Sequence, residues 1–190
     1  WNRPLETLLR STHFRSVASR RLQDIYGGEV VLHSPHVPHR PPPIGSPAQR
    51  QFRDTLGLPG DARIILFAGN AAKHKGLRRL TKLLKDDCWP NNLYLLLAGD
   101  HRQAAFQNAK SASPRQVHLA GTVPNSEMWR LLGATDVVLT LLDQSTYSQS
   151  QIPAKLLEAL AYGRPVIASD VGDLPDLVGA DTKGPRGWIV

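Results

Sequence analysis

The chain has 190 residues, of which 41% are hydrophobic and 21% are charged. This length and composition suit one globular domain with additional segments, and no apolar run is long enough to cross a bilayer. Lys and Arg number 23 against 16 Asp and Glu, a formal charge of +7, which favours anionic partners such as nucleotide phosphates or an anionic membrane surface. Nucleic acid is not an expected partner, because no aromatic residues alternate with the basic ones and no reading helix is evident.

The cysteine content and the chain ends bear on where the protein works. Cys88 is the single cysteine, so no internal disulfide can form, and no charged-then-apolar signal sequence opens the chain. Both features favour a cytoplasmic location. The sequence starts at Trp1 without a methionine and stops at residues 188–190, where a strand is expected to begin, so we interpret it as a piece of a longer protein.

The first part of the chain is predicted to hold one helix and one short strand. Residues 5–26 carry leucines, valine and isoleucine among many arginines, which indicates a helix that Gly27 and Gly28 end. A strand is predicted at residues 30–32. We expect this helix and strand to have no sheet of their own, and we assign residues 1–34 to the end of a preceding structural unit.

A proline-rich segment follows. Between residues 34 and 47 proline is too frequent for a helix or an interior strand, so we predict an extended linker, assigned to residues 35–59. Three histidines recur at every third position: His33, His36 and His39. No cysteine or carboxylate accompanies them, so we favour a linker over a metal site.

Residues 60–190 alternate apolar runs with helical segments. Strands are predicted at 64–68, 94–98, 117–119, 137–142 and 166–168. Helices are predicted at 77–84, 103–110, 126–132, 153–162 and 174–178. Near-continuous apolar strands that alternate with helices indicate an α/β fold, a doubly wound parallel sheet covered on both faces. Ligands bind such sheets at the carboxyl ends of the strands, where the strand order reverses.

The turn after the first of these strands is a candidate phosphate site. It runs from Gly69 to Gly76 and carries Lys73 and Lys75 before a helix. Glycine lets the backbone approach a phosphate, the helix N-terminus offers N–H groups, and a lysine neutralises an oxygen. The turn lacks the P-loop ending and the three-glycine dinucleotide pattern. A solvated strand-to-helix turn explains the same residues, so both interpretations stay open.

A polar loop at residues 143–151 leads into the helix that begins at Pro153. Its amides and hydroxyls either cap that helix or hold a phosphate or sugar hydroxyl, and a flexible surface loop is the alternative. Within the helix, Lys155, Glu158 and Tyr162 are predicted to share the face away from the core. Glu158 is a candidate acceptor for ribose hydroxyls, and the alternative is a surface ion pair with Lys155.

Four segments in this order and spacing resemble a known family: Gly69–Gly76, Gly121–Pro124, Ser150–Glu158 and Ser169–Gly172. Together they resemble the C-terminal, donor-binding half of the retaining family 4 glycosyltransferases, a Rossmann-like half of the GT-B fold. The resemblance covers about residues 60–190 and, weakly, the segments before them. It implies an enzyme that transfers a hexose from a nucleotide sugar, such as a UDP-sugar, to a saccharide or lipid-linked acceptor in polysaccharide biosynthesis.

The resemblance also implies roles for individual residues. In the family, Gly-Arg, four residues and Lys-Gly form the turn that grips the donor diphosphate; here Lys75 matches, Asn70 replaces the arginine, and Lys73 is expected to supply the second charge. Two glutamates lie eight residues apart in the family, and the second holds ribose. Glu158 matches the second, whereas Ser150 stands at the first. The implied donor-binding set is Gly69, Asn70, Lys73, Lys75, Val123, Ser150, Gln151, Lys155 and Glu158, with Val123 at the base.

Catalytic residues are not assigned. In the family, the acceptor site and an important histidine belong to the N-terminal half, nearly all of which this chain lacks, so we expect donor binding without turnover. No loop carries an Asp-x-Asp pair, so neither a metal nor another cofactor is expected. A stand-alone sugar-nucleotide binding module and a GT-B-like UDP-sugar epimerase are the alternatives. The basic N-terminal segment allows for peripheral contact with an anionic membrane.

Overall fold

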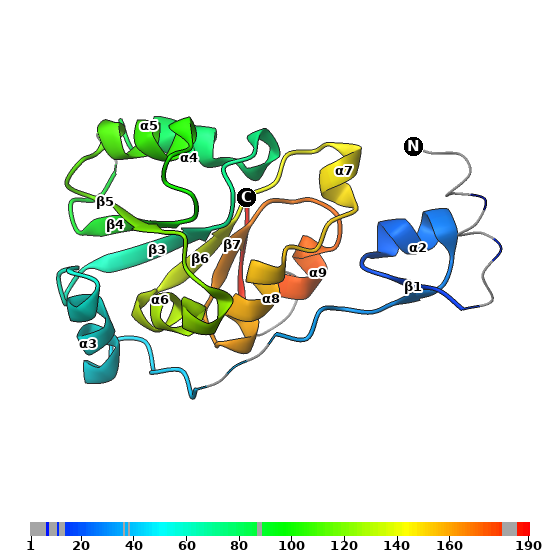
Figure 1. Ribbon diagram of the computed structural model, residues 1–190, viewed down its shortest axis with the longest axis horizontal. Helices are drawn as coiled ribbons and strands as arrows, with labels where there is room; N and C mark the ends of the chain where they lie inside the picture. The colour runs from blue at the N-terminus through cyan, green and yellow to red at the C-terminus, as the bar shows by residue number, and fades with distance from the viewer. Residues whose placement is uncertain are drawn as a thin grey trace.

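The computed structural model describes residues 7, 11, 14–35, 37, 39–86, 89–179 and 186–190. Six strands form one parallel sheet in the order β5-β4-β3-β6-β7-β8 (Figure 1). They are β3 (Arg63–Ala68), β4 (Leu93–Ala98), β5 (Val117–Gly121), β6 (Val137–Thr140), β7 (Val166–Ala168) and β8 (Gly187–Ile189). The strand order therefore runs outward in both directions from β3 and β6, and the doubly wound fold predicted from the sequence is confirmed.

The strand register brings the ends of β3 and β6 to the same edge of the sheet. β3 pairs in parallel with β4 along its whole length and with β6 from Ile65 to Phe67. Because every pair in this sheet is parallel, the carboxyl ends of all six strands face one side. The order of the strands reverses between β3 and β6, and this is the point where such a sheet leaves a crevice for a ligand.

Helices cover both faces of this sheet (Figure 1). One face carries α4 (Leu77–Leu83) and α5 (Ala104–Ala112), and the other carries α6 (Met128–Ala134), α8 (Ala154–Ala161) and α9 (Leu174–Val178). Among the residues that the structure describes, no helix combines the length and the apolar character needed to span a membrane.

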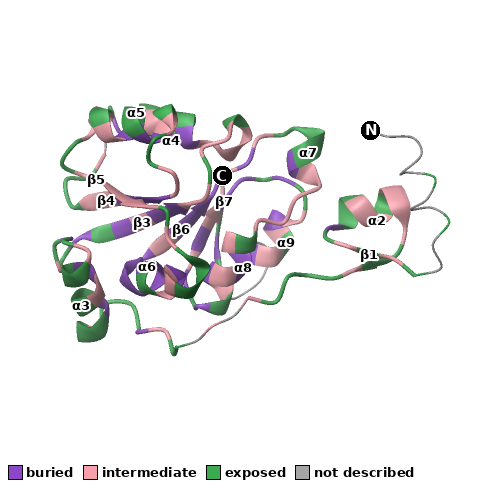
Figure 2. Cartoon of the chain, in the orientation of Figure 1, coloured by how far each residue is buried: buried purple, intermediate pink, exposed green. Residues whose placement is uncertain are grey.

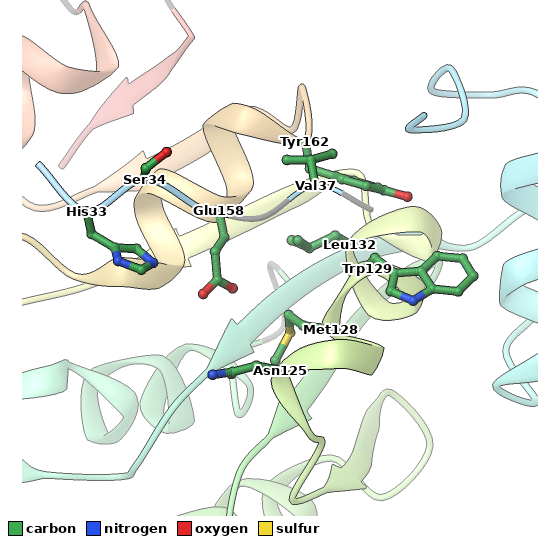
Figure 3. A pocket seen from close by; sticks show the side chains of 9 residues that line it. All are labelled: His33, Ser34, Val37, Asn125, Met128, Trp129, Leu132, Glu158 and Tyr162. Carbon is green, nitrogen blue, oxygen red and sulfur yellow. The ribbon is translucent and has the colours of Figure 1, made fainter. Parts of the chain in front are cut away.

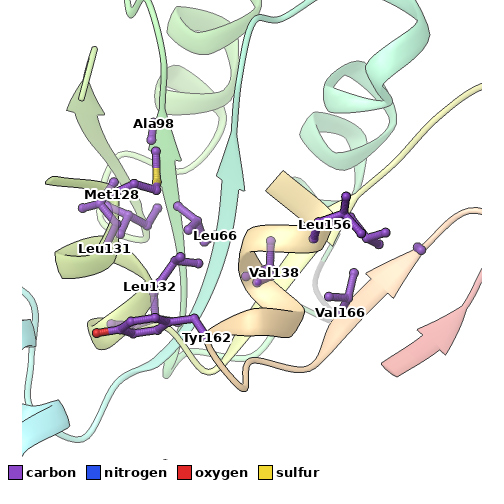
Figure 4. Packing of buried hydrophobic residues seen from close by; sticks show 14 of the residues in the cluster. Leu66, Ala98, Met128, Leu131, Leu132, Val138, Leu156, Tyr162 and Val166 are labelled. Carbon is purple, nitrogen blue, oxygen red and sulfur yellow. The ribbon is translucent and has the colours of Figure 1, made fainter. Parts of the chain in front are cut away.

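Each face of the sheet has its own hydrophobic core, and the central strands are buried from both sides (Figure 2). The α4 and α5 side includes Leu77, Leu80, Leu95, Leu97 and Phe106. The other side includes Leu66, Leu131, Leu132, Val138, Leu156 and Val166 (Figure 4). Burial on both faces is the reason why the strands read as continuous apolar runs rather than as alternating patterns.

Tyr162 corrects the predicted face of the last long helix. Its side chain is 2% exposed and lies in the core beside Leu132 (Figure 4), so Tyr162 does not belong to a face away from the core. Tyr162 is the C-cap of α8, and its ring belongs to the core cluster that also contains Leu132 of α6. Burial of the large aromatic ring is favoured over exposure, and the ring packs between the helices.

The N-terminal part differs from the prediction. α2 (Arg20–Tyr26) is preceded by β1 (Ser16–Val17), which pairs in parallel with β2 (Glu29–Val30). The prediction of one helix over 5–26 is therefore wrong at β1, and the helix and strand do have a small sheet of their own. Ser19 starts α2 because its hydroxyl caps the first turn. Other parts of that predicted helix lie outside the described residues: 5–6, 8–10 and 12–13.

The predicted linker at 35–59 contains a helix. α3 (Pro47–Thr55) begins after the cap residue Ser46, and proline is compatible with a first helical turn because its missing N–H would be unpaired there. α3 packs against α6, where the rings of Phe52 and Trp129 meet edge to face at 5.5 Å between centroids. The prediction of an extended linker is therefore wrong at α3, and the division into domains stays a prediction.

A buried ion pair ties α3 to the sheet. Arg53 Nη2 donates to both carboxylate oxygens of Asp136 at 2.7 Å, and the two side chains are 6% and 11% exposed. Asp136, which precedes β6, also accepts a hydrogen bond from the backbone N–H of Ile64 in β3 at 2.7 Å. The pair therefore joins α3, β3 and β6 at the amino ends of the strands, away from the edge where ligands bind.

Replacing Asp136 with alanine should lower the free energy of unfolding by about 3 to 5 kcal/mol, because Arg53 would be left buried and unpaired. The double variant Arg53→Met/Asp136→Leu should lose less, since it leaves no buried charge. Urea denaturation followed by circular dichroism measures both. Glu127→Ala is the control, because the Glu127–Arg130 pair is exposed and should contribute less than about 1 kcal/mol. Equal losses in Asp136→Ala and Glu127→Ala would contradict this account.

Candidate functional site

A cavity of about 220 Å³ lies at the carboxyl ends of β3 and β6, at the reversal of the strand order. Three segments that are distant in sequence line it: the turn after β3, the end of β6 and the first turn of α8. Its wall includes Gly69, Lys75, Thr140, Pro153, Ala154 and Lys155. A cavity therefore lies where the sequence predicts one, at the carboxyl ends of the strands.

The turn after β3 depends on two glycines. Gly69 has a φ of 141°, and Gly76, with a φ of 67°, ends the 3-10 helix η1 (Lys73–Lys75) and starts α4. A Cβ on Gly76 would lie 2.5 Å from Cβ of Leu141, so only glycine allows this turn to pack against the segment that follows β6. The close packing places Lys75 over the cavity.

Lys75 is the strongest feature of this cavity. Its side chain is half-buried, and none of the ion pairs in the described part of the chain includes it. Burial lowers the pKa of its ammonium group below the ordinary 10.5, because the charged form loses hydration. A Cβ placed on Gly69 would lie 3.5 Å from Nζ of Lys75, so the ammonium sits over bare backbone. A desolvated, unpaired cation in a glycine turn is suited to binding an anion.

The other basic residue predicted for the diphosphate lies elsewhere. Lys73 is exposed and does not line the cavity, and Asn70 is exposed as well. The second lysine in the cavity wall is Lys155, from the first turn of α8. The structure therefore brings together Gly69, Lys75 and Lys155 and leaves Asn70 and Lys73 at the surface.

Glu158 and Lys155 form an ion pair on α8. Lys155 Nζ lies 2.9 and 2.8 Å from the two carboxylate oxygens of Glu158 and donates a third hydrogen bond to Oδ1 of Asn125 at 3.2 Å. The side chains are only 25% and 16% exposed, so this is not an ordinary solvated surface pair. Asn125 was missed from the sequence, because its contact with α8 joins residues thirty positions apart.

A second cavity, also of about 220 Å³, lies next to this pair (Figure 3). The carboxylate of Glu158 extends from α8 toward the space between His33 and Asn125 (Figure 3). The apolar part of its lining is Val37, Met128, Trp129, Leu132 and Tyr162. Polar groups at one side and an apolar wall at the other are typical of a small-molecule site.

Of Val123, His33 and His39, only His33 lines this second cavity. Val123, in the turn before the 3-10 helix η2 (Asn125–Glu127), is partly buried against the apolar core. His33 lines the cavity, whereas the ring of His39 lies 4.2 Å from that of Trp129. These two histidines therefore make separate contacts, and His36 lies outside the described residues.

Ser150 and Gln151 are not brought to either cavity. They line a larger hollow of about 730 Å³ between α2 and the short helix α7 (Thr146–Gln149). Ser150 Oγ donates to the carbonyl of Thr146 at 3.0 Å, and the carbonyl of Ser150 accepts from Ser19 Oγ at 2.9 Å. Neither predicted residue therefore lies among those that line the Lys75 cavity.

Asp143 is a further polar residue near the site that sequence reasoning did not single out. Its carboxylate accepts hydrogen bonds from Ser145 Oγ at 2.6 Å and from Ser148 Oγ at 2.7 Å. These bonds hold the pKa of Asp143 down at about 2. Its backbone N–H donates to the carbonyl of His74 at 2.8 Å, which fastens the loop after β6 to the turn that carries Lys75. The Asp-x-Ser-x-x-Ser spacing of residues 143–148 was the signal in the sequence for these hydrogen bonds.

Replacing Asp143 with asparagine should lower the melting temperature at neutral pH. The folded-state pKa of Asp143 is depressed, so its stabilising effect is present above the ordinary value of 3.8 and is lost as the pH falls toward about 2. Thermal melts at neutral pH and at pH about 3 measure this difference. The gap between variant and parent should narrow at the lower pH, and a gap that stays constant would show that the carboxylate charge is not responsible.

The model of the family described as glycosyl transferases group 1 matches residues 48–190. This match covers most of the chain, so the chain belongs to that family. TuaC of Bacillus subtilis (strain 168), provisionally named a teichuronic acid biosynthesis glycosyltransferase, is 30% identical over 135 residues, which are 69% of this chain and 31% of TuaC. The uncharacterized glycosyltransferase MJ1607 of Methanocaldococcus jannaschii is 30% identical over 136 residues, or 70% of this chain and 34% of MJ1607.

Solved structures show the same fold. Anabaena Alr3699/HepE, crystallised in complex with UDP-glucose, matches with a TM-score of 0.73 and 20% identity, over 99% of this chain and 52% of that one. The resemblance to GT-B glycosyltransferases inferred from the four sequence segments is thereby confirmed. The chain spans about a third of the length of the two curated relatives and about half of the HepE chain.

Proposed function

We propose that this chain is the donor-binding half of a retaining glycosyltransferase that transfers a hexose from a nucleotide sugar, with a UDP-sugar as the first candidate. The acceptor would be a saccharide or a lipid-linked saccharide, in cytoplasmic polysaccharide biosynthesis. The observation that carries the proposal is the unpaired, half-buried Lys75 at the point where the strand order reverses. Membership in the glycosyl transferases group 1 family supports it, as does the UDP-glucose bound by HepE.

The two cavities divide the proposed donor between them. The diphosphate would lie in the cavity lined by Lys75, where the N-terminus of α8 adds partial positive charge. The ribose would place its paired hydroxyls on Glu158, and the base would lie near the turn that contains Val123. This arrangement agrees with the charges of the side chains, because the ammonium of Lys75 would meet the diphosphate and the carboxylate of Glu158 would meet the ribose hydroxyls.

The chemistry available to this chain is stabilisation of the leaving group. When the bond between the sugar and the diphosphate breaks, negative charge develops on the diphosphate, and Lys75 and the helix N-terminus would stabilise it. Placing the acceptor and excluding water would require groups from the other half of the enzyme. We therefore propose that this chain alone binds a donor without turnover, and that it does so without a metal or another cofactor.

A stand-alone nucleotide-sugar binding module is the second candidate. Asn70 is exposed and Ser150 is bonded within its own loop, so neither replaces the charged side chain expected at its position. This observation favours binding without catalysis. Sequencing the coding region upstream would separate the two candidates, since a preceding α/β half supports the enzyme.

Calorimetric titration with UDP, GDP, ADP and their common sugar conjugates should show saturable binding of one nucleotide. Lys75→Ala and Glu158→Ala should each weaken that binding by about 1 to 3 kcal/mol, because each removes a charge-assisted hydrogen bond. Lys73→Ala is the matched control, since it removes the same charge from an exposed position in the same turn. If both site variants bind like the parent, the assigned site is wrong.

A further inference from the structure

Lys155 lies at the junction of the two cavities. It contributes to the wall of the cavity that holds Lys75, while its ammonium group is bonded to Glu158 and Asn125, which line the other cavity. Both oxygens of Glu158 accept from this one nitrogen, at 2.9 and 2.8 Å. The carboxylate that would hold ribose hydroxyls is therefore already engaged.

The cavity that holds Lys75 has more positive than negative side chains around it. Two lysines, Lys75 and Lys155, line the first cavity, and the ion pairs of the described residues supply a carboxylate to Lys155 alone. A diphosphate in that cavity would offer oxygens to both ammonium groups. A nucleoside without phosphates offers Lys155 nothing in exchange for Glu158, because hydroxyl groups are weaker partners for a cation than a carboxylate is.

We propose that Lys155 is a phosphate-binding residue that Glu158 holds in place, so that a nucleoside diphosphate, and not a nucleoside, exchanges the ion pair for contacts with the ligand. This inference rests on the proposed function. Phosphate oxygens take over Lys155, and the freed carboxylate accepts the ribose hydroxyls. Lys155 thereby makes recognition of ribose depend on the presence of the diphosphate, and it supplies the second cation that exposed Lys73 does not.

The exchange predicts changes of opposite sign in one variant. Lys155→Met should weaken UDP binding by about ten- to one-hundred-fold, because a charge-assisted contact is lost. The same variant should bind uridine about two- to five-fold more tightly, because Glu158 no longer has to leave an ion pair. Amide chemical-shift titrations measure both ligands, including weak ones, with GDP and guanosine run in parallel. Lys73→Met is the control for the loss of one positive charge.

A reciprocal variant tests the other side of the pair. Glu158→Gln frees the ammonium of Lys155, so inorganic pyrophosphate alone should bind this variant more tightly than the parent, by about two- to five-fold. UDP should bind it more weakly, since the ribose loses its charged acceptor and keeps only the weaker amide oxygen. If the ion pair had a purely structural role, Glu158→Gln would change the affinities for pyrophosphate and for UDP in the same direction.

The outcomes separate the two proposals. If the parent binds none of the nucleotides, the proposed function itself fails. If the parent binds UDP or GDP but Lys155→Met leaves both nucleotide and nucleoside binding unchanged, or weakens both, Lys155 is not exchanged and the inference is overturned. Weaker nucleotide binding with unchanged nucleoside binding also overturns it, because the competition for Glu158 would then be absent.

Discussion

The reversal of strand order between β3 and β6 is the constraint on which this site depends. The chain leaves β3 toward one face of the sheet and leaves β6 toward the other, so the space beyond these two strand ends is not filled by a crossing segment. The turn at Lys75 and the start of α8 enclose that space from opposite sides. Parallel pairing therefore creates the cavity, and the glycines at 69 and 76 allow a lysine to reach it.

Stability and binding are separated along the strands. At the amino ends, Arg53 and Asp136 are buried together, and each charge satisfies the other. At the carboxyl ends, Lys75 is half-buried without such a partner. Its pKa is lowered because burial removes water from the charged ammonium group. A cation that the fold leaves unpaired next to a cavity is available to an anionic ligand, whereas one that the fold pairs is not. Lys155 stands between these cases, since its partner Glu158 is itself a proposed ligand-binding group.

The sequence allowed the sheet, its edge and the turn at Lys75 to be predicted, because burial of β3 and β4 on both faces produces continuous apolar runs. It did not predict that Tyr162 would be buried, because its burial depends on packing with residues of another helix, such as Leu132 of α6. The contact between Lys155 and Asn125 was also out of reach, because it depends on how two separate elements pack. Sequence position likewise suggested Ser150 for the donor site, yet a local hydrogen bond holds it in another hollow.

The central claim is that a nucleoside diphosphate binds across the carboxyl ends of β3 and β6. Mapping amide chemical shifts of this chain during titration with UDP and GDP tests this most directly. The account predicts that the largest changes cluster in the Lys75 turn, around Asn125 and in the first turns of α8, while residues around Arg53 and Asp136 stay unchanged. Saturable binding with the changes centred instead on α3, or on the hollow beside α2, would contradict it.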